Sequence, residues 1–215
     1  MKTSAQFGDM VDGYSVPVLN EREIRASAGI LFLGAFLSLM FIIFQGNFVA
    51  AKYFVIIFLL DFIIRLHITP RQAPTLILGR WIVRNQLPEF VGAAQKQFAW
   101  KIGLLLASLM FVLLIVLNTY SFLTGLICLI CLLFLFFESV FGICLGCIVY
   151  KRFYPEEAKY CPGESCELND QHETQKIKRS QWTTFFVFVF GMTLLLYALS
   201  GIIGLRPENL WEFLF

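Results

Sequence analysis

Long apolar segments dominate this chain, and short polar segments separate them. A helix needs about 20 apolar residues to cross a hydrocarbon core roughly 30 Å thick. Five segments meet that length, at residues 26–46, 48–66, 98–118, 122–148 and 182–205. They are continuously apolar and do not alternate, which argues against a closed barrel. The pattern predicts an all-α fold, a polytopic transmembrane helix bundle with a four-helix core and a fifth C-terminal span.

The polar segments divide the chain into regions. We expect an N-terminal segment at 1–25, the four-helix core at 26–150, a loop at 151–181, the fifth span at 182–205 and a tail at 206–215. Within the core, residues 74–84 are too short to span, and their Arg and Trp side chains stand beside aliphatic ones. That mixture favours a helix in the headgroup layer, with an ordinary connector as the alternative.

Composition agrees with a lipid environment. The 215 residues are 58% hydrophobic and 15% charged, and the mean hydropathy is +0.73. A net charge of +2 gives no indication of nucleic-acid binding. The first 25 residues are mostly polar and carry no secretory signal pattern, so we expect the first apolar segment to be an uncleaved span.

The positions of Lys and Arg predict the orientation. Basic residues gather before the first predicted span, between the second and third, and between the fourth and fifth. The opposite side holds only Lys52 and Arg206. Because basic loops stay cytoplasmic, this asymmetry places the amino terminus in the cytoplasm and the carboxyl terminus outside.

Two close cysteine pairs are the candidate chemistry. Cys144 and Cys147 form a C-x-x-C near the end of the fourth predicted span, and Cys161 and Cys166 follow in the polar loop. Pairs of thiols at short range are typical of dithiol redox chemistry, sulfur transfer or metal binding. The predicted topology puts both pairs on the cytoplasmic side, where a stable structural disulfide is disfavoured.

The first pair has a geometric constraint. The fourth predicted span runs to residue 148, so we expect the motif to close a helix, where the helix dipole disfavours a thiolate. Positions three apart on a helix have Cβ atoms about 5–6 Å apart, whereas a disulfide needs about 3.8 Å. Cys144 and Cys147 can therefore form a disulfide only if the helix distorts, which Gly142 and Gly146 permit. The alternative is that Cys144 and Cys147 simply pack a helix end.

The second pair leaves three interpretations open. Pro162 and Gly163 favour a turn that brings Cys161 and Cys166 together. They are either a second dithiol that exchanges with the first, or half of a four-cysteine site for zinc or an iron–sulfur cluster, or two solvent-exposed thiols without a role. The cofactor is otherwise unknown from the sequence.

Other candidate groups lie within the spans. Glu138 is a carboxyl in an apolar segment, so we expect an ion-pair partner, with Arg65 or Lys101 as candidates, or a proton-handling role. On a straight helix it does not align with Cys144 and Cys147.

Cys128 and Cys131 form another C-x-x-C that we interpret as apolar filling. Asp61 and Arg65 can pair across one turn. His67 is either a satisfied or solvated histidine, which we favour, or an interfacial proton carrier, and His172 has no evident partner.

These motifs in order resemble an uncharacterised bacterial integral-membrane family, catalogued as a domain of unknown function. The resemblance covers roughly residues 15–152. The matching stretches are 17–22 with Arg25, 61–65 before Pro70, 96–99 with Ile102 and Gly103, and Glu138 with 144–147. It implies a compact four-helix core in the bacterial inner membrane and, as a partner, a thioredoxin-like or rhodanese-type sulfur protein.

The sequence therefore favours a membrane-embedded thiol–disulfide or sulfur-transfer protein. Cys144, Cys147, Cys161, Cys166 and Glu138 are its candidate catalytic residues, and a thiol–disulfide oxidoreductase is the enzyme class considered. The alternatives are a small transporter or channel-like module for a sulfur compound, with Glu138, Asp61 and Arg65 along its path, and a structural membrane subunit with a four-cysteine metal site.

Overall fold

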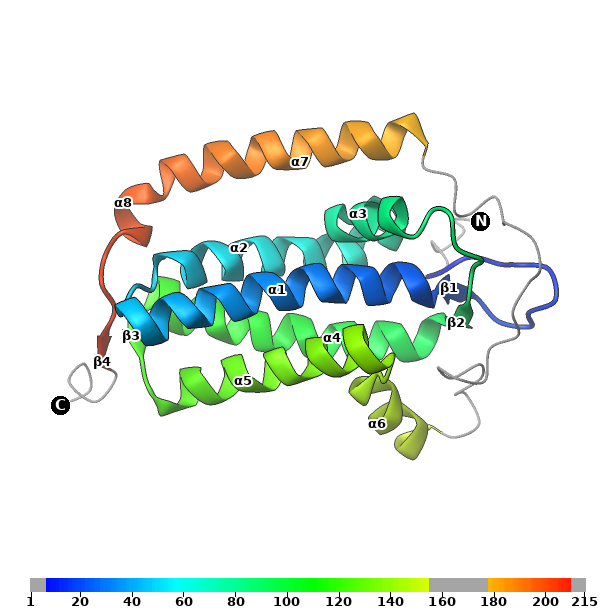
Figure 1. Ribbon diagram of the computed structural model, residues 1–215, viewed down its shortest axis with the longest axis horizontal. Helices are drawn as coiled ribbons and strands as arrows, with labels where there is room; N and C mark the ends of the chain where they lie inside the picture. The colour runs from blue at the N-terminus through cyan, green and yellow to red at the C-terminus, as the bar shows by residue number, and fades with distance from the viewer. Residues whose placement is uncertain (1–6, 155–177, 210–215) are drawn as a thin grey trace, which may run out of the picture.

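Long helices run side by side along one axis and form the bundle that the apolar pattern predicts (Figure 1). The computed structural model describes residues 7–154 and 178–209. The α-helices are α1 Glu21–Gln45, α2 Val49–Ile63, α3 Pro74–Ile82, α4 Ala93–Phe111, α5 Phe122–Phe136, α6 Leu145–Phe153, α7 Arg179–Ala198 and α8 Ser200–Ile203. The all-α fold class is confirmed.

Three of the long helices continue as a single π-helical turn. These turns are Ile64–Ile68 after α2, Val112–Val116 after α4 and Phe137–Phe141 after α5. A short 3₁₀ turn, Pro70–Gln72, leads into α3. Turns of π-helix rotate side chains out of the normal helical register and are frequent at functional sites. Here two of them carry charged side chains, the buried Arg65 and the partly buried Glu138.

Four helices of the described residues are long and apolar enough to cross a membrane. They are Glu21–Gln45, Ala93–Val116, Phe122–Phe141 and Arg179–Ala198. The protein is therefore a multi-pass membrane protein. The second predicted span corresponds to α2, which is 15 residues long before its π-helical turn. Together they carry three charged side chains, Lys52, Asp61 and Arg65, all of them buried in the protein.

Short strands tie the helix ends together. Strand β1 (Val18–Asn20) pairs antiparallel with β2 (Phe90–Gly92), and β3 (Thr119–Tyr120) pairs parallel with β4 (Glu208–Asn209). β1 leads directly into α1 and β2 leads directly into α4, at the same end of the bundle as α3 and α6 (Figure 1). The β1–β2 ladder therefore fixes the first turns of α1 and α4 beside each other.

The core lies between α1, α2, α4 and α5. Its centre includes buried residues from each of these helices: Leu31, Phe58, Phe62, Trp100 and Leu135. The helix predicted at 74–84 is present as α3, which packs on α1 so closely that a Cβ on Gly79 would lie 2.5 Å from the Glu23 carbonyl oxygen. Its place in the headgroup layer stays a prediction.

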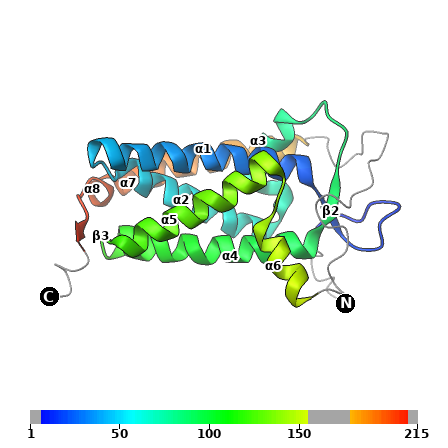
Figure 2. The same cartoon turned by 60° about the horizontal axis from the view of Figure 1, so that its bottom comes forward.

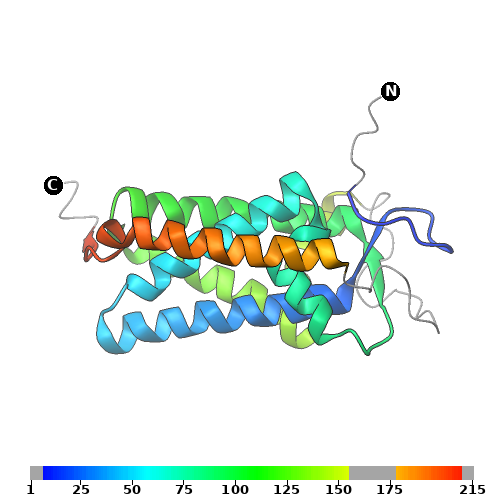
Figure 3. The ribbon, with the colours of Figure 1, turned by 90° about the horizontal axis from the view of Figure 1, so that it is seen from above.

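The fifth predicted span is present as α7, which lies on the outside of the bundle (Figure 3). It contacts α3 at one end, and a small cluster of Ile56, Met192 and Ile203 joins α7 and α8 to α2 at the other. At this second end the buried Lys52 donates to the Asn118 side chain at 2.6 Å and to the Leu205 carbonyl at 2.7 Å. The Lys52 ammonium thus anchors the segment that follows α8.

Candidate thiol site

The Cys144–Cys147 motif opens a helix, so the expectation that it closes one is wrong. The fourth span ends at Phe141, and Gly142 adopts the left-handed conformation with φ 68°. Cys144 is then the N-cap of α6, with extended backbone, and its Sγ accepts the backbone N–H of Cys147 at 3.3 Å. The chain leaves the line of α5 at this point and crosses α4 as α6 (Figure 2).

This change of direction alters the electrostatics of the motif. At the start of a helix the free N–H groups and the dipole favour negative charge, so Cys144 occupies a position that stabilises a thiolate. A disulfide between Cys144 and Cys147 also needs no break within a continuous helix, because Cys144 already lies outside it. A straight fourth span would disfavour both a thiolate at Cys144 and a disulfide with Cys147, and the break at Gly142 removes both obstacles.

Both thiols are buried, and they differ from each other. Cys144 and Cys147 are free cysteines, each 3% exposed. The pKa of Cys147 is raised, first by its hydrogen bond with Cys144 and then by burial, while Lys96 opposes the rise. Cys147 is therefore the thiol that keeps its proton, and Cys144 is the thiol placed to act as nucleophile.

A buried ion cluster lies beside the two thiols. Lys96 in α4 is fully buried, and its Nζ is 2.7 Å from Glu21 Oε2 and 2.7 Å from Glu138 Oε1. The expected partner of Glu138 is thus Lys96, neither Arg65 nor Lys101. The Lys96 ammonium acts electrostatically on both thiols. The cluster therefore places one cation and two carboxylates close to the thiols.

The cluster and the thiols beside it come from four elements: α1, α4, the π-helical turn after α5, and α6. The β1–β2 ladder places Glu21 beside Lys96 at the first turns of α1 and α4. The π-helical turn Phe137–Phe141 carries Glu138. α6 then packs on α4 so closely that a Cβ on Gly146 would lie 2.6 Å from the Cβ of Ala99. Glu138 therefore reaches the motif through a broken helix, and the expectation that it lies apart from the thiols is wrong.

Sequence reasoning missed Glu21 and Lys96 as site residues. Lys96 is one of the basic residues between the second and third predicted spans, and Glu21 lies in the stretch 17–22 of the family resemblance. A usable signal was that both belong to stretches of the family resemblance although each begins an apolar helix, where a buried charge needs a partner.

A small cavity of about 50 Å³ reaches the motif. Glu138, Arg65 and Cys144 bring polar groups to its wall, and most of the remaining wall is apolar or aromatic. Phe62 and Trp100 line it and also flank the Arg65 guanidinium, whose Cζ lies 4.8 and 5.1 Å from the two ring centroids.

The Asp61–Arg65 pair is confirmed. Arg65 Nε lies 2.6 Å from Asp61 Oδ2, and the two side chains are 2% and 0% exposed. Thr75 from α3 donates to Asp61 through both its backbone N–H and its hydroxyl, and Arg65 also donates to Ser27 in α1. The pair therefore joins α1, α2 and α3 through a fully buried polar network.

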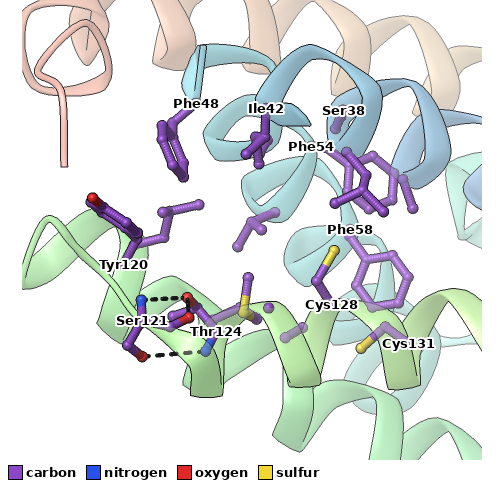
Figure 4. Close-up of a pocket in the computed structure, with 18 of the residues that line it drawn as sticks. Ser38, Ile42, Phe48, Phe54, Phe58, Tyr120, Ser121, Thr124, Cys128 and Cys131 are labelled. Atoms are coloured by element: carbon purple, nitrogen blue, oxygen red, sulfur yellow. Dashed lines mark hydrogen bonds between the residues drawn. The ribbon is translucent and has the colours of Figure 1, made fainter. Parts of the chain in front are cut away.

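A larger, apolar cavity of about 280 Å³ lies further along the bundle, between α1, α2, α4 and α5 (Figure 4). Cys128 and Cys131 line it, and Ser121 and Thr124 form hydrogen bonds with each other at one end. Cys131 also lines the small cavity. Apolar filling remains our interpretation of this pair.

Several predicted residues are not brought into the site. His67 is exposed, with Nδ1 3.3 Å from the Ile63 carbonyl oxygen. Cys161, Cys166 and His172 lie outside the described residues. Within residues 7–154 and 178–209, no group of three or more His, Cys, Asp or Glu side chains is arranged to hold a metal ion. The four-cysteine metal site requires Cys161 and Cys166 and stays a prediction.

Comparison with known proteins gives one match. Residues 19–154 match the family model described as "Domain of unknown function (DUF4395)". The match covers the four-helix core and the Cys144–Cys147 motif and ends before α7. No curated protein and no solved structure matches the chain.

Proposed function

The chain belongs to the DUF4395 family, and we propose that it is a membrane-embedded thiol–disulfide or sulfur-transfer protein whose reacting pair is Cys144 and Cys147. The observation that carries this proposal is the arrangement of the pair at the start of α6, beside the buried Lys96 ammonium and its two carboxylates. A pair that only packed a helix end would need neither the N-cap geometry nor a buried cation.

The roles of the residues follow from their positions. Cys144 attacks a disulfide or persulfide sulfur, because its Sγ receives the helix N-terminal N–H and stands near Lys96. Cys147 holds its proton until it attacks Cys144 Sγ and releases the bound group. Glu138 lines the cavity beside Cys144 and is the carboxylate placed to accept a proton. Lys96 stabilises the anionic sulfur that forms.

We further propose that the site lies at the cytoplasmic face of a bacterial inner membrane. β1, β2, α3 and α6 share one end of the bundle (Figure 1), and the basic residues of the sequence gather at that end. The amino terminus then lies in the cytoplasm and the carboxyl terminus outside. A thioredoxin-like or rhodanese-type protein is the proposed partner, with Cys161 and Cys166 as a second thiol pair.

A redox titration tests the proposal. The full chain in detergent is equilibrated at a series of thiol–disulfide potentials and quenched with acid, and the thiols still free are labelled with a maleimide after denaturation. Peptide mass spectrometry then reads each cysteine separately. Cys144 and Cys147 should lose their label together over one range of potential. If both stay free at every potential, the redox proposal is wrong.

Transport of a sulfur compound is the second candidate, because Glu138 and Arg65 line the small cavity. Fewer observations support transport, because the side chains of Asp61 and Arg65, expected along the path, are already bonded to each other and to Thr75. Uptake of labelled sulfide or thiosulfate into vesicles separates the two functions. Uptake that survives Cys144→Ala and Cys147→Ala would favour transport without thiol chemistry.

A further inference from the structure

We propose that the small cavity beside Cys144 binds an inorganic sulfane-sulfur compound of two sulfur atoms, disulfane or its hydrogen disulfide anion, and that Cys144 takes one sulfur atom from it. This inference rests on the proposed function and narrows it to one substrate class. Three features of the cavity support it, namely its size, the composition of its wall and the presence of Cys144 among its lining residues.

The size of the cavity favours small sulfur donors. One water needs about 10–15 Å³ of such cavity volume, so a cavity of about 50 Å³ holds a molecule of about three to five heavy atoms. Cys144 and Cys147 are both 3% exposed, which leaves little sulfur surface for a peptide disulfide. Glutathione disulfide exceeds this space, whereas thiosulfate, with its five heavy atoms, is disfavoured by the wall of the cavity.

The wall of the cavity suits a small, soft sulfur compound of low charge. The Arg65 guanidinium is already paired with Asp61 at 2.6 Å, so it supplies no uncompensated cation, and Glu138 adds a carboxylate that can accept a proton. Phe62 and Trp100 bring aromatic rings, with which polarizable divalent sulfur makes favourable contacts. A hard oxyanion would leave most of its oxygens facing apolar side chains without hydrogen bonds.

The reaction balances without any other reactant. The Cys144 thiol gives its proton to Glu138, and the thiolate Sγ attacks one sulfur atom of disulfane, H–S–S–H. A new S–S bond forms to Cys144 Sγ, and the S–S bond of disulfane breaks. The departing hydrosulfide takes up the proton from Glu138, so that the products are the Cys144 persulfide and hydrogen sulfide. One sulfane sulfur moves, and no external oxidant or reductant is consumed.

Peptide mass spectrometry of the full chain tests this assignment. The reduced protein is exposed separately to inorganic polysulfide, to thiosulfate and to glutathione disulfide, and then quenched. We expect the Cys144 peptide to gain one sulfur atom with polysulfide at least about tenfold faster than it forms an adduct with either larger compound. Cys144→Ser should abolish the gain at this site, and Cys147→Ser should make the added sulfur persist longer, because the second thiol no longer releases it.

Two variants test whether size is the cause. Leu145→Ala removes bulk from the cavity wall and should let glutathione disulfide react at Cys144, whereas the control Leu129→Ala, at a lipid-facing position outside both cavities, should not. In the opposite direction, Ala28→Val fills part of the cavity and should slow sulfur uptake several-fold. This second variant keeps the test informative if Leu145→Ala does not fold.

The outcomes separate the two levels of the proposal. Equal rates at Cys144 with polysulfide and glutathione disulfide in the unmodified chain would overturn the size argument and leave thiol–disulfide exchange standing. No sulfur gain with polysulfide, in a protein whose Cys144–Cys147 pair still titrates with potential, would overturn the sulfane-sulfur assignment alone. A pair that stays free at every potential would overturn the proposed function itself.

Discussion

Replacing Lys96 by Met should destabilise the protein and weaken the reactivity of Cys144. Met keeps similar bulk but leaves the carboxylates of Glu21 and Glu138, each 2.7 Å from the ammonium in the structure, without their shared cation. Removing one partner of a buried ion pair costs about 3–5 kcal/mol. At about 1.4 kcal/mol per factor of ten, the equilibrium constant for folding falls by roughly two to three and a half powers of ten.

A charge-balanced variant separates the two effects. The triple variant Lys96→Met, Glu21→Gln, Glu138→Gln removes both uncompensated carboxylates, so it should regain most of the lost stability, because a neutral replacement of a buried ion pair is often tolerated. It still lacks the ammonium beside the thiols. We therefore expect near-normal unfolding but Cys144 chemistry as slow as in the single variant.

Unfolding in mixed detergent micelles, followed by tryptophan fluorescence, measures the stability of each variant, and sulfur uptake at Cys144 measures reactivity. Lys101→Met is the matched control, since Lys101 lies exposed on the same helix, and it should change neither. A loss below about 1 kcal/mol for Lys96→Met, or a triple variant no more stable than the single one, would refute the buried cluster as described.

Three further changes test other parts of the structure. Gly79→Ala places a Cβ 2.5 Å from a carbonyl oxygen of α1, so the free energy of unfolding should fall by about 1–3 kcal/mol; an unchanged unfolding midpoint would contradict that packing. Lys52→Met leaves the Leu205 carbonyl without its donor, and proteolysis should accelerate after α8; equal cleavage would show that the anchor is unimportant. Cys144→Ala removes the main cause of the raised Cys147 pKa, so thiolate absorbance of Cys147 should appear at lower pH than in the unmodified protein; a midpoint that stays or rises would exclude the thiol–thiol hydrogen bond.

The helix positions could be predicted because they depend on local apolarity. The first, third and fifth predicted spans each fall on a long helix of the bundle, and the second falls on α2. The break in the fourth span could not be read this way, since residues 122–148 are almost continuously apolar. It depends on tertiary packing: α6 approaches α4 at Gly146, and a Cβ on Gly142 would lie 2.9 Å from Arg25 Cζ.

The thiol pair could be found from its spacing, but its surroundings could not. Glu21, Lys96 and Glu138 lie far apart in the sequence, and a three-residue strand pair brings the first two together. Strands this short give no periodic signal. Lys96 lies where its charge also fits the cytoplasmic bias, so its place at the start of an apolar helix agrees with a solvated charge as well as with a buried ion cluster.

The most direct test of the account is the redox titration of Cys144 and Cys147 in a chain whose other cysteines, Cys128, Cys131, Cys161 and Cys166, are replaced by Ala. The account predicts that both thiols are lost together into one intramolecular disulfide with a single midpoint potential, and that this midpoint shifts in the Lys96→Met background but not in Lys101→Met. Two thiols that remain free at every potential, or that oxidise independently of Lys96, would contradict it.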